Sequence, residues 1–218
     1  MIDRILPHDV ASAWAFDDTA DIPLFPEEEA ALARAVERRR REFTTVRGCA
    51  RRALAGLGLS AAPLVPGVRG APVWPDGVVG SMTHCDGYRA AAVARTPGTA
   101  AVGIDAEPHG PLPEGVLGVV GRPEERAWIA EGGAGPGVHW DRLLFSAKEA
   151  VFKVWYPLTR RELDFTEAVV VFHAGGTFTA RLLVPGPAVG SGTLTELPGR
   201  WTAAGGLALT AVVLPAPR

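Results

Sequence analysis

Both lysines of this 218-residue chain lie in one short stretch, Phe145 to Lys153, whereas twenty arginines are the cations everywhere else. Lysine carries a compact ammonium group and arginine a flat fork, so Lys148 and Lys153 are predicted to meet a need that arginine would not. Glu149 lies between them, and its spacing of four residues from Lys153 is also that of a surface ion pair on a helix. The flanking residues are largely apolar, which favours a narrow charged strip lining a cleft. There Glu149 could bind a metal and accept a proton while the lysines neutralise phosphate oxygens.

Two further carboxylates, Asp105 and Glu107, close an apolar segment that ends at Pro108. Residues two apart in a strand point to the same face, so one cation could meet both side chains. An isolated pair of this kind is more often two solvated surface acids, because acidic residues are mostly exposed. Glu149 adds a third carboxylate, and no cluster of histidines or cysteines accompanies the three. Such an oxygen-only set favours Mg²⁺ held by Asp105, Glu107 and Glu149, and with it a phosphate-bearing substrate.

A candidate phosphate-binding segment runs from Gly80 to His84 and includes two hydroxyls, those of Ser81 and Thr83. Hydroxyl groups and an imidazole can all donate hydrogen bonds to a phosphate. A lone histidine is more often structural, so this segment alone would not identify a site.

Arginines that could complete such a cradle lie in a preceding helical segment. Arg47 and Arg51 are four residues apart and so share one helix face, and arginine forks suit phosphate geometry. The run from Arg38 to Arg41 is in part typical of a solvated face. Arg39 is the member of that run that we expect to reach the ligand.

The charge balance argues against nucleic acid or an anionic membrane as the main partner, since the formal net charge is −2. Between residues 34 and 52, eight arginines against two glutamates give +6, which leaves −8 on the rest of the chain. An RNA-binding module on that segment is an alternative, but it would lack interleaved aromatics and leave the acidic cluster unexplained. The two cysteines are far apart and no leader or long apolar run is evident, which predicts a reduced, cytoplasmic protein.

Helical and strand-like segments follow one another in a pattern typical of an α+β protein. Composition and spacing predict helices over 27–41, 43–57, near 123–129 and over 139–155, the last of these stopped by Pro157. Alternating or β-branched residues predict strands at 78–81, 89–95, 100–106, 168–172, 177–183, 192–197 and 207–214. Both halves combine helices with short strands, which permits a duplicated architecture although no strict sequence repeat is evident.

The order of these motifs resembles that of the 4′-phosphopantetheinyl transferases of the surfactin-synthetase-activating and enterobactin-synthetase-component-D type. The matching segments are Arg39-Arg-Arg-Glu-Phe43 with Arg47, Gly70-x-Pro-x-Trp-Pro-x-Gly77, Gly80-Ser-x-Thr-His84, Val102-Gly-Ile-Asp-Ala-Glu107 and Phe145-Ser-x-Lys-Glu-x-x-x-Lys153. They span residues 39 to 153, and the last two carry most of the specificity.

The resemblance implies transfer of phosphopantetheine from coenzyme A to a serine hydroxyl of an apo acyl or peptidyl carrier protein, with release of adenosine 3′,5′-bisphosphate. It also implies a monomer of two pseudo-symmetric α+β halves, residues 1–102 and 103–218, with coenzyme A between them. The first half would bind the phosphates and adenylate of the coenzyme. The second half would hold the metal, the catalytic helix and the carrier-docking surface.

The resemblance also assigns roles to single residues. Asp105, Glu107 and Glu149 would hold Mg²⁺ on the diphosphate, and Glu149 would accept the serine proton directly or through water. The remaining coenzyme A contacts would come from Lys148 and Lys153 on the diphosphate, from Ser81, Thr83, His84, Arg39 and Arg47 on the phosphates, and from Arg69 at the adenylate end.

Two further expectations concern partners. A magnesium-dependent nucleotide or diphosphate hydrolase could use the same acids and lysines, but it would release product without a carrier. For the transferase, we expect a carrier to dock on an apolar patch near Trp155, Tyr156 and Leu158, rimmed by Arg160 and Arg161. The alternative is that Trp155 belongs to the core, where tryptophan is usually largely buried.

Overall fold

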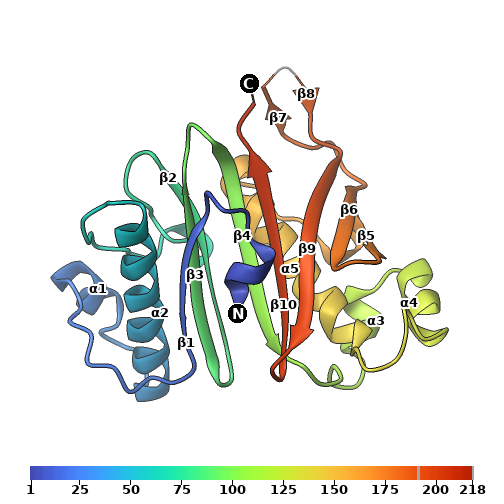
Figure 1. The fold of residues 1–218 in the computed structure, drawn as a ribbon, viewed down its shortest axis with the longest axis horizontal. Coiled ribbons are helices and arrows are strands. Elements are labelled where there is room, and N and C mark those ends of the chain that lie inside the picture. Colours follow the sequence, from blue (N-terminus) through green and yellow to red (C-terminus); the bar gives the residue numbers. More distant parts are fainter. Residues whose placement is uncertain (191, 218) are drawn as a thin grey trace.

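A computed structural model of the chain describes residues 1–190 and 192–217. Its two larger sheets are antiparallel and lie side by side, each with one long helix packed on it, as Figure 1 shows. The expected α+β fold class is confirmed.

The N-terminal half packs helix α2 (Glu37–Gly56) on a three-stranded sheet in the order β1-β3-β2. These strands are β1 (Ala11–Ala15), β2 (Val78–Cys85) and β3 (Tyr88–Arg95). Buried α2 side chains recur every three or four residues, as at Phe43, Val46, Ala50 and Leu54, and form one apolar face. Strand β3 is rich in alanine, whose small side chains allow close packing on both faces of the sheet.

The C-terminal half contains a five-stranded sheet in the order β4-β10-β9-β6-β5. Its strands are β4 (Thr99–Pro108), β5 (Ala168–His173), β6 (Thr177–Leu182), β9 (Glu196–Ala204) and β10 (Leu207–Pro215). Helix α5 (Trp140–Thr159) lies on one face, and the short N-terminal helix η1 (Ile2–Ile5) lies on the opposite face of β4 and β10.

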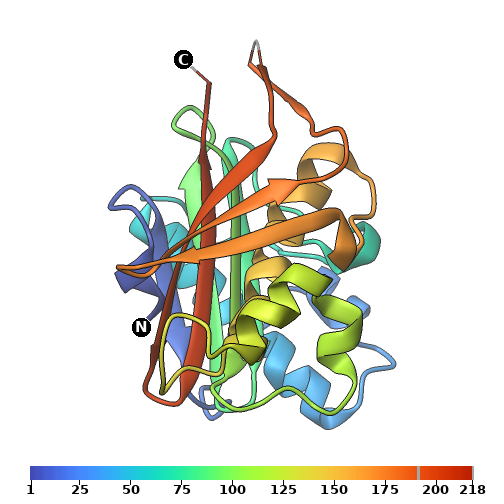
Figure 2. The same cartoon turned by 90° about the vertical axis from the view of Figure 1, so that its right-hand side faces the viewer.

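Shorter elements complete the two halves. Helix α1 (Pro26–Ala31) precedes α2, and η2 (Val68–Gly70) follows it. Helices α3 (Val116–Val120) and α4 (Pro123–Ala130) lie beside strands β5 and β6 in Figure 2. A 3₁₀ turn, η3 (Phe165–Glu167), leads into β5, and β7 (Ala188–Val189) pairs with β8 (Gly192–Thr193).

Side-chain hydroxyls of β2 link the two sheets across the line where β2 meets β4. Ser81 Oγ accepts a hydrogen bond from the backbone N–H of Ile104 at 3.1 Å, and Thr83 Oγ1 accepts one from Ala106 at 3.1 Å. All of β4 pairs with β10, so the expected division at residues 102 and 103 falls inside a strand of the second sheet.

The two halves share a local construction that is also visible in the sequence. Helices α1 and α4 both begin with Pro-Glu-Glu. The second of these glutamates is buried in each case and pairs with a cation of the next long helix, α2 or α5. The equivalent residues lie 97 positions apart in the sequence: Pro26 corresponds to Pro123, Glu28 to Glu125 and Arg51 to Lys148. This common spacing supports the duplicated architecture.

Two helix predictions were wrong in detail. The segment 27–41 is not one helix, because the chain turns after Ala31 and α2 begins at Glu37. The Arg40 side chain stabilises this turn by donating to the Leu32 carbonyl at 3.0 Å and to Glu29 at 2.7 Å.

Helix α5 also continues through Pro157 instead of ending before it. The last turn remains hydrogen-bonded, because Arg160 N–H donates to Tyr156 at 2.8 Å and Thr159 Oγ1 donates to Trp155 at 3.0 Å. The helix then ends at Arg160, whose φ of 56° lies in the left-handed region.

Within residues 1–190 and 192–217, none of the helices combines the length and the apolar character needed to cross a membrane.

Candidate functional site

Strand β4 and helix α5 cross in very close contact at Gly103. A Cβ atom at this position would lie 2.1 Å from the carbonyl oxygen of Ala150, so the crossing requires glycine. Gly103 shares one face of β4 with Asp105 and Glu107, and α5 side chains contact both carboxylates. The prediction that the two acids point to the same side is therefore confirmed.

Asp105 lies at the junction of the two halves and is only 5% exposed. Its Oδ1 accepts hydrogen bonds from Lys153 Nζ at 2.7 Å and from Thr83 Oγ1 at 3.3 Å. Lys153 also donates to the Ile104 carbonyl at 3.0 Å. Within the described part of the chain, the buried Oδ2 of Asp105 has no hydrogen-bond partner. An unpartnered carboxylate oxygen is costly to bury, so this atom suits a cation ligand.

Glu107 is partly engaged by the protein itself. Its Oε2 accepts a hydrogen bond from Arg142 Nη1 at 2.9 Å, and Arg142 also donates to the carbonyls of Gly110 and Pro111. Burial, and after it the charge of Asp105, raises the pKa of Glu107, and Arg142 opposes this rise. Arg142 thus occupies one of the two carboxylate oxygens of Glu107.

Glu149 completes the acidic corner from helix α5. Burial, followed by the negative charge of Asp105, raises the pKa of Glu149, and Lys153 opposes the shift. A divalent cation would relieve this repulsion between neighbouring carboxylates. The residues that the structure describes contain no preformed cluster of three such ligands, so the three-carboxylate magnesium site remains a prediction.

A cavity of about 570 Å³ opens beside the acidic corner and is lined by both halves of the protein. Glu149 and Lys153 belong to its C-terminal wall. Arg39, Arg47, Ser81 and His84 lie in its N-terminal wall, so the structure brings together four of the five residues predicted to contact phosphate.

Positive charge dominates the N-terminal wall. Arg47 is buried, and this burial lowers the pKa of its guanidinium to about 10. Its charged group lies 3.6 Å from the centre of the Phe43 ring. Arg39 Nη1 lies 3.2 Å from His84 Nε2, and burial, followed by the Arg39 charge, lowers the pKa of His84. Glu42 lies in the same wall, 3.7 Å from His84 Nε2, and opposes the lowering of the His84 pKa. The cations of this wall still outnumber it, so the wall suits a phosphate.

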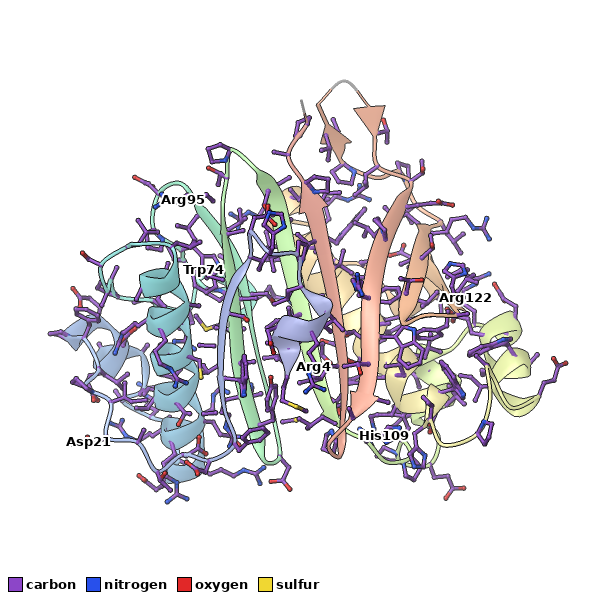
Figure 3. All side chains as sticks on the ribbon, in the orientation of Figure 1. Arg4, Asp21, Trp74, Arg95, His109 and Arg122 are labelled. Atoms are coloured by element: carbon purple, nitrogen blue, oxygen red, sulfur yellow. The ribbon has the colours of Figure 1, made fainter. Side chains whose placement is uncertain are left out.

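Arg69 spans the mouth of the cleft from the loop that contains η2. Its φ of 58° lies in the left-handed region, and its Nε pairs with Glu162 of the other half at 2.7 Å. Trp74 closes the same loop onto β2 by donating from Nε1 to the Gly80 carbonyl at 3.0 Å, and Figure 3 labels it beside α2.

A second, smaller cavity of about 250 Å³ adjoins the first, and Arg69, Glu149 and Phe152 line both. Its other walls include Leu163 and Phe165, which give it apolar surface.

The prediction that Lys148 binds a phosphate is corrected by its surroundings. Lys148 borders the smaller cavity but is 3% exposed, and its ammonium group already has three acceptors. Nζ donates to Glu125 at 2.6 Å and to the carbonyls of Val120 and Phe165 at 2.9 and 2.7 Å. An ammonium group has three protons, so all of its hydrogen-bonding capacity is used. Lys148 therefore anchors α5 to the elements around it.

The predicted role of Thr83 also changes, whereas that of Ser81 stays a prediction. Both hydroxyls accept backbone N–H groups of β4, and Thr83 donates to Asp105. Ser81 lines the larger cavity, whereas Thr83 does not. Both hydroxyls join the two halves, and that of Thr83 also orients Asp105. Ser81 lines the cavity, so its predicted contact with a phosphate stays a prediction, as do those of the arginines and His84.

The predicted docking patch is not an exposed surface. Trp155 is 1% exposed and Tyr156 is 6% exposed, and Trp155 Nε1 donates to the Arg161 carbonyl at 2.9 Å. Leu158 packs against the same core. The interpretation of Trp155 as a core residue is therefore the correct one.

Sequence reasoning missed three residues that support the site: Glu28, Arg142 and Glu162. Glu28 carries a usable signal, because its Pro-Glu-Glu sequence returns 97 residues later. Arg142 and Glu162 belong to none of the sequence motifs, and only the folded chain brings Arg142 to Glu107 and Glu162 to Arg69.

Two family models match the chain and together cover most of it. The model described as the 4′-phosphopantetheinyl transferase N-terminal domain matches residues 27–94, and the model of the 4′-phosphopantetheinyl transferase superfamily matches residues 101–203. The gap between the matches falls at the start of β4, close to the junction of the two sheets.

Characterised proteins are similar along the full length. The 4′-phosphopantetheinyl transferase Svp of Streptomyces mobaraensis is 60% identical over 100% of this chain and 90% of its own. The 4′-phosphopantetheinyl transferase Npt of Nocardia iowensis is 50% identical over 97% and 99%, respectively. The 4′-phosphopantetheinyl transferase PptT of Mycobacterium tuberculosis is 46% identical over 98% of each chain.

Proposed function

The chain belongs to the 4′-phosphopantetheinyl transferase superfamily, and from this membership we propose that the cleft between its two sheets is the site of transfer. The protein transfers 4′-phosphopantetheine from coenzyme A to carrier proteins. Coenzyme A fits the larger cavity with its phosphates on Arg39, Arg47 and His84. Its pantetheine arm extends past Glu149 into the smaller cavity, whose apolar walls suit that chain. Arg69, in both cavities, would contact the coenzyme after parting from Glu162.

Magnesium is the proposed cofactor, and the donor set fits it. Asp105 Oδ2 is a buried oxygen without a hydrogen-bond donor in the described chain, and Glu149 lines the cavity beside it. Glu107 would join them through Oε1, because Arg142 bonds only Oε2. When bound, Mg²⁺ supplies charge neutralisation to the diphosphate.

The protein's own groups would carry the proton and position the reactants. The serine oxygen forms a bond to the phosphorus that carries pantetheine, and the bond from that phosphorus to adenosine 3′,5′-bisphosphate breaks. Glu149 lines the cavity and accepts the serine proton, directly or through one water. Lys153, oriented by Asp105 and the Ile104 carbonyl, stabilises charge on the diphosphate oxygens.

One observation carries this proposal: an unpartnered carboxylate oxygen and an oriented lysine lie at the junction of two halves, opposite a wall of arginines. Phosphoryl transfer needs such charge neutralisation and positioning more than covalent catalysis. The direct test is incubation with coenzyme A, Mg²⁺ and a panel of apo acyl and peptidyl carrier proteins. Intact mass should report the addition of phosphopantetheine to a carrier, and Lys153→Arg serves as the matched variant. Loss of coenzyme A without any mass change on a carrier would favour the hydrolase alternative.

We also propose that the protein acts as a monomer in the cytoplasm. Both walls of the cleft come from one chain, so a second copy is not needed to complete the site. Cys49 and Cys85 are both free, as expected in a reducing compartment. Light scattering at working concentration would test the monomer directly, and a dimer mass would contradict it.

A further inference from the structure

A fully buried carboxylate, Glu28, lies behind the cationic wall of the cleft. Its oxygens accept backbone N–H groups from Leu64 at 2.9 Å and from Phe25 at 3.0 Å. Glu28 also pairs with Arg51, which is 12% exposed and lies one helical turn after Arg47 on α2. A buried charge of this kind persists only when it is paired and hydrogen-bonded, so its three partners, Phe25, Arg51 and Leu64, are tied together through it.

Arg47 is connected to this carboxylate by two routes. Its Nε donates to the carbonyl of Leu64 at 3.1 Å, and the N–H of the same residue binds Glu28. Burial lowers the pKa of the Arg47 guanidinium, and the negative charge of Glu28 opposes this shift. Through these contacts, Arg47 is fixed at Nε while it lines the cavity.

We propose that Glu28 is a positioning residue for recognition of the 3′-phosphate of coenzyme A, acting through Leu64 and Arg47. The inference rests on the proposed function of the cleft, in which Arg47 binds a phosphate. Glu28 itself does not touch the substrate, because it is fully buried and does not line the cavity.

The duplicated architecture provides a matched control. Glu125 occupies the equivalent position in α4, where it accepts the N–H groups of Arg122 and Val170 and pairs with Lys148. It is equally well buried, but it supports α5 and not the cationic wall. Figure 3 labels Asp21, shortly before α1, and Arg122, the N-cap of α4, on opposite sides of the molecule.

The experiment measures the affinity of the parent, Glu28→Gln and Glu125→Gln for coenzyme A and for dephospho-coenzyme A, which lacks the 3′-phosphate. All measurements are made well below the unfolding transition of each variant. The parent should prefer coenzyme A by about tenfold or more, the typical weight of one charge-assisted contact. Glu28→Gln should lose most of this preference, and Glu125→Gln should keep it.

Arg47→Ala, alone and combined with Glu28→Gln, separates positioning from general destabilisation. If Glu28 acts through Arg47, adding Glu28→Gln to Arg47→Ala leaves the preference unchanged. Should Glu28→Gln not fold, Glu28→Asp takes its place, because it keeps the charge but withdraws the carboxylate by one methylene.

The outcomes are distinct. An unchanged preference in the Glu28 variant, or an equal loss in the Glu125 variant, overturns the inference while the proposed cradle stands. A parent that binds both ligands equally overturns the assignment of the 3′-phosphate to Arg47, and the role of Glu28 with it, while the proposed site of transfer stands.

Discussion

Replacing Lys148 with methionine is predicted to destabilise the protein and to leave its affinity for coenzyme A intact. Methionine has a similar length but no charge, so Glu125 would remain buried without its ion partner, and the carbonyls of Val120 and Phe165 would lose a donor. Breaking a buried ion pair on one side typically costs about 3–5 kcal/mol, because the other charge stays uncompensated. In a chain of this size, that corresponds to a fall in Tm of roughly 6–20 °C.

Urea unfolding gives the stability change, and calorimetric titration with coenzyme A gives the affinity at a temperature where the variant is folded. The double variant Lys148→Met with Glu125→Gln should recover at least half of the lost stability, because it removes both charges of the pair. Arg47→Ala is the positive control for affinity, since Arg47 lines the cleft and should lower coenzyme A binding without the same loss of stability.

Two results would refute this reasoning. One is a stability loss below about 1 kcal/mol, which is the size expected of an exposed ion pair. The other is a folded Lys148→Met variant that loses as much coenzyme A affinity as Arg47→Ala, which would restore the role predicted from the sequence.

Four further predictions address the cleft. Lys153→Arg should slow single-turnover transfer by about a hundredfold or more, because a guanidinium cannot reproduce the ammonium contacts near the diphosphate; a rate within a few-fold of the parent would remove Lys153 from the active site. Asp105→Asn should raise the Mg²⁺ concentration required for transfer at least about tenfold, and an unchanged magnesium titration would exclude Asp105 as a ligand. Burial and Arg39 lower the pKa of His84 in the free protein, whereas a bound phosphate would raise this pKa. Coenzyme A binding should therefore take up a proton, and the affinity should fall as pH rises through the pKa of His84 in the complex. Calorimetric titrations in buffers of different ionisation enthalpy measure this proton uptake, and zero uptake from pH 6 to 8 contradicts the prediction. Gly103→Ala should cost about 1–3 kcal/mol in urea unfolding, because its methyl group meets the Ala150 carbonyl, and parent-like stability would mean that α5 can move away.

The sequence alone determined the chemistry of the acidic corner. The spacing of Asp105 and Glu107 in an apolar strand requires a shared face, and Glu149 and Lys153 are close to one helical turn apart. These relations are local, so they follow from the repeat of a strand or a helix without knowledge of the fold. The motif order was sufficient to predict the α+β class and the family.

The sequence carries only faint marks of the duplication. Its markers are few, namely Pro-Glu-Glu and a cation 23 residues after the second glutamate. The structure explains this spacing, because in each half it forms a buried ion pair, Glu28 with Arg51 and Glu125 with Lys148.

Tertiary structure decided which polar groups remain for the substrate. Lys148 and Lys153 are five residues apart, which separates them by roughly 140° around a helix of 3.6 residues per turn. Lys153 therefore faces β4 and the cleft, while Lys148 faces α3, α4 and η3. Thr83 likewise meets β4 and Asp105 and does not line the cavity. A side chain's type limits the bonds that it can form, but the neighbour that it meets depends on contacts between residues distant in sequence, and these arise only when the sheets and helices pack.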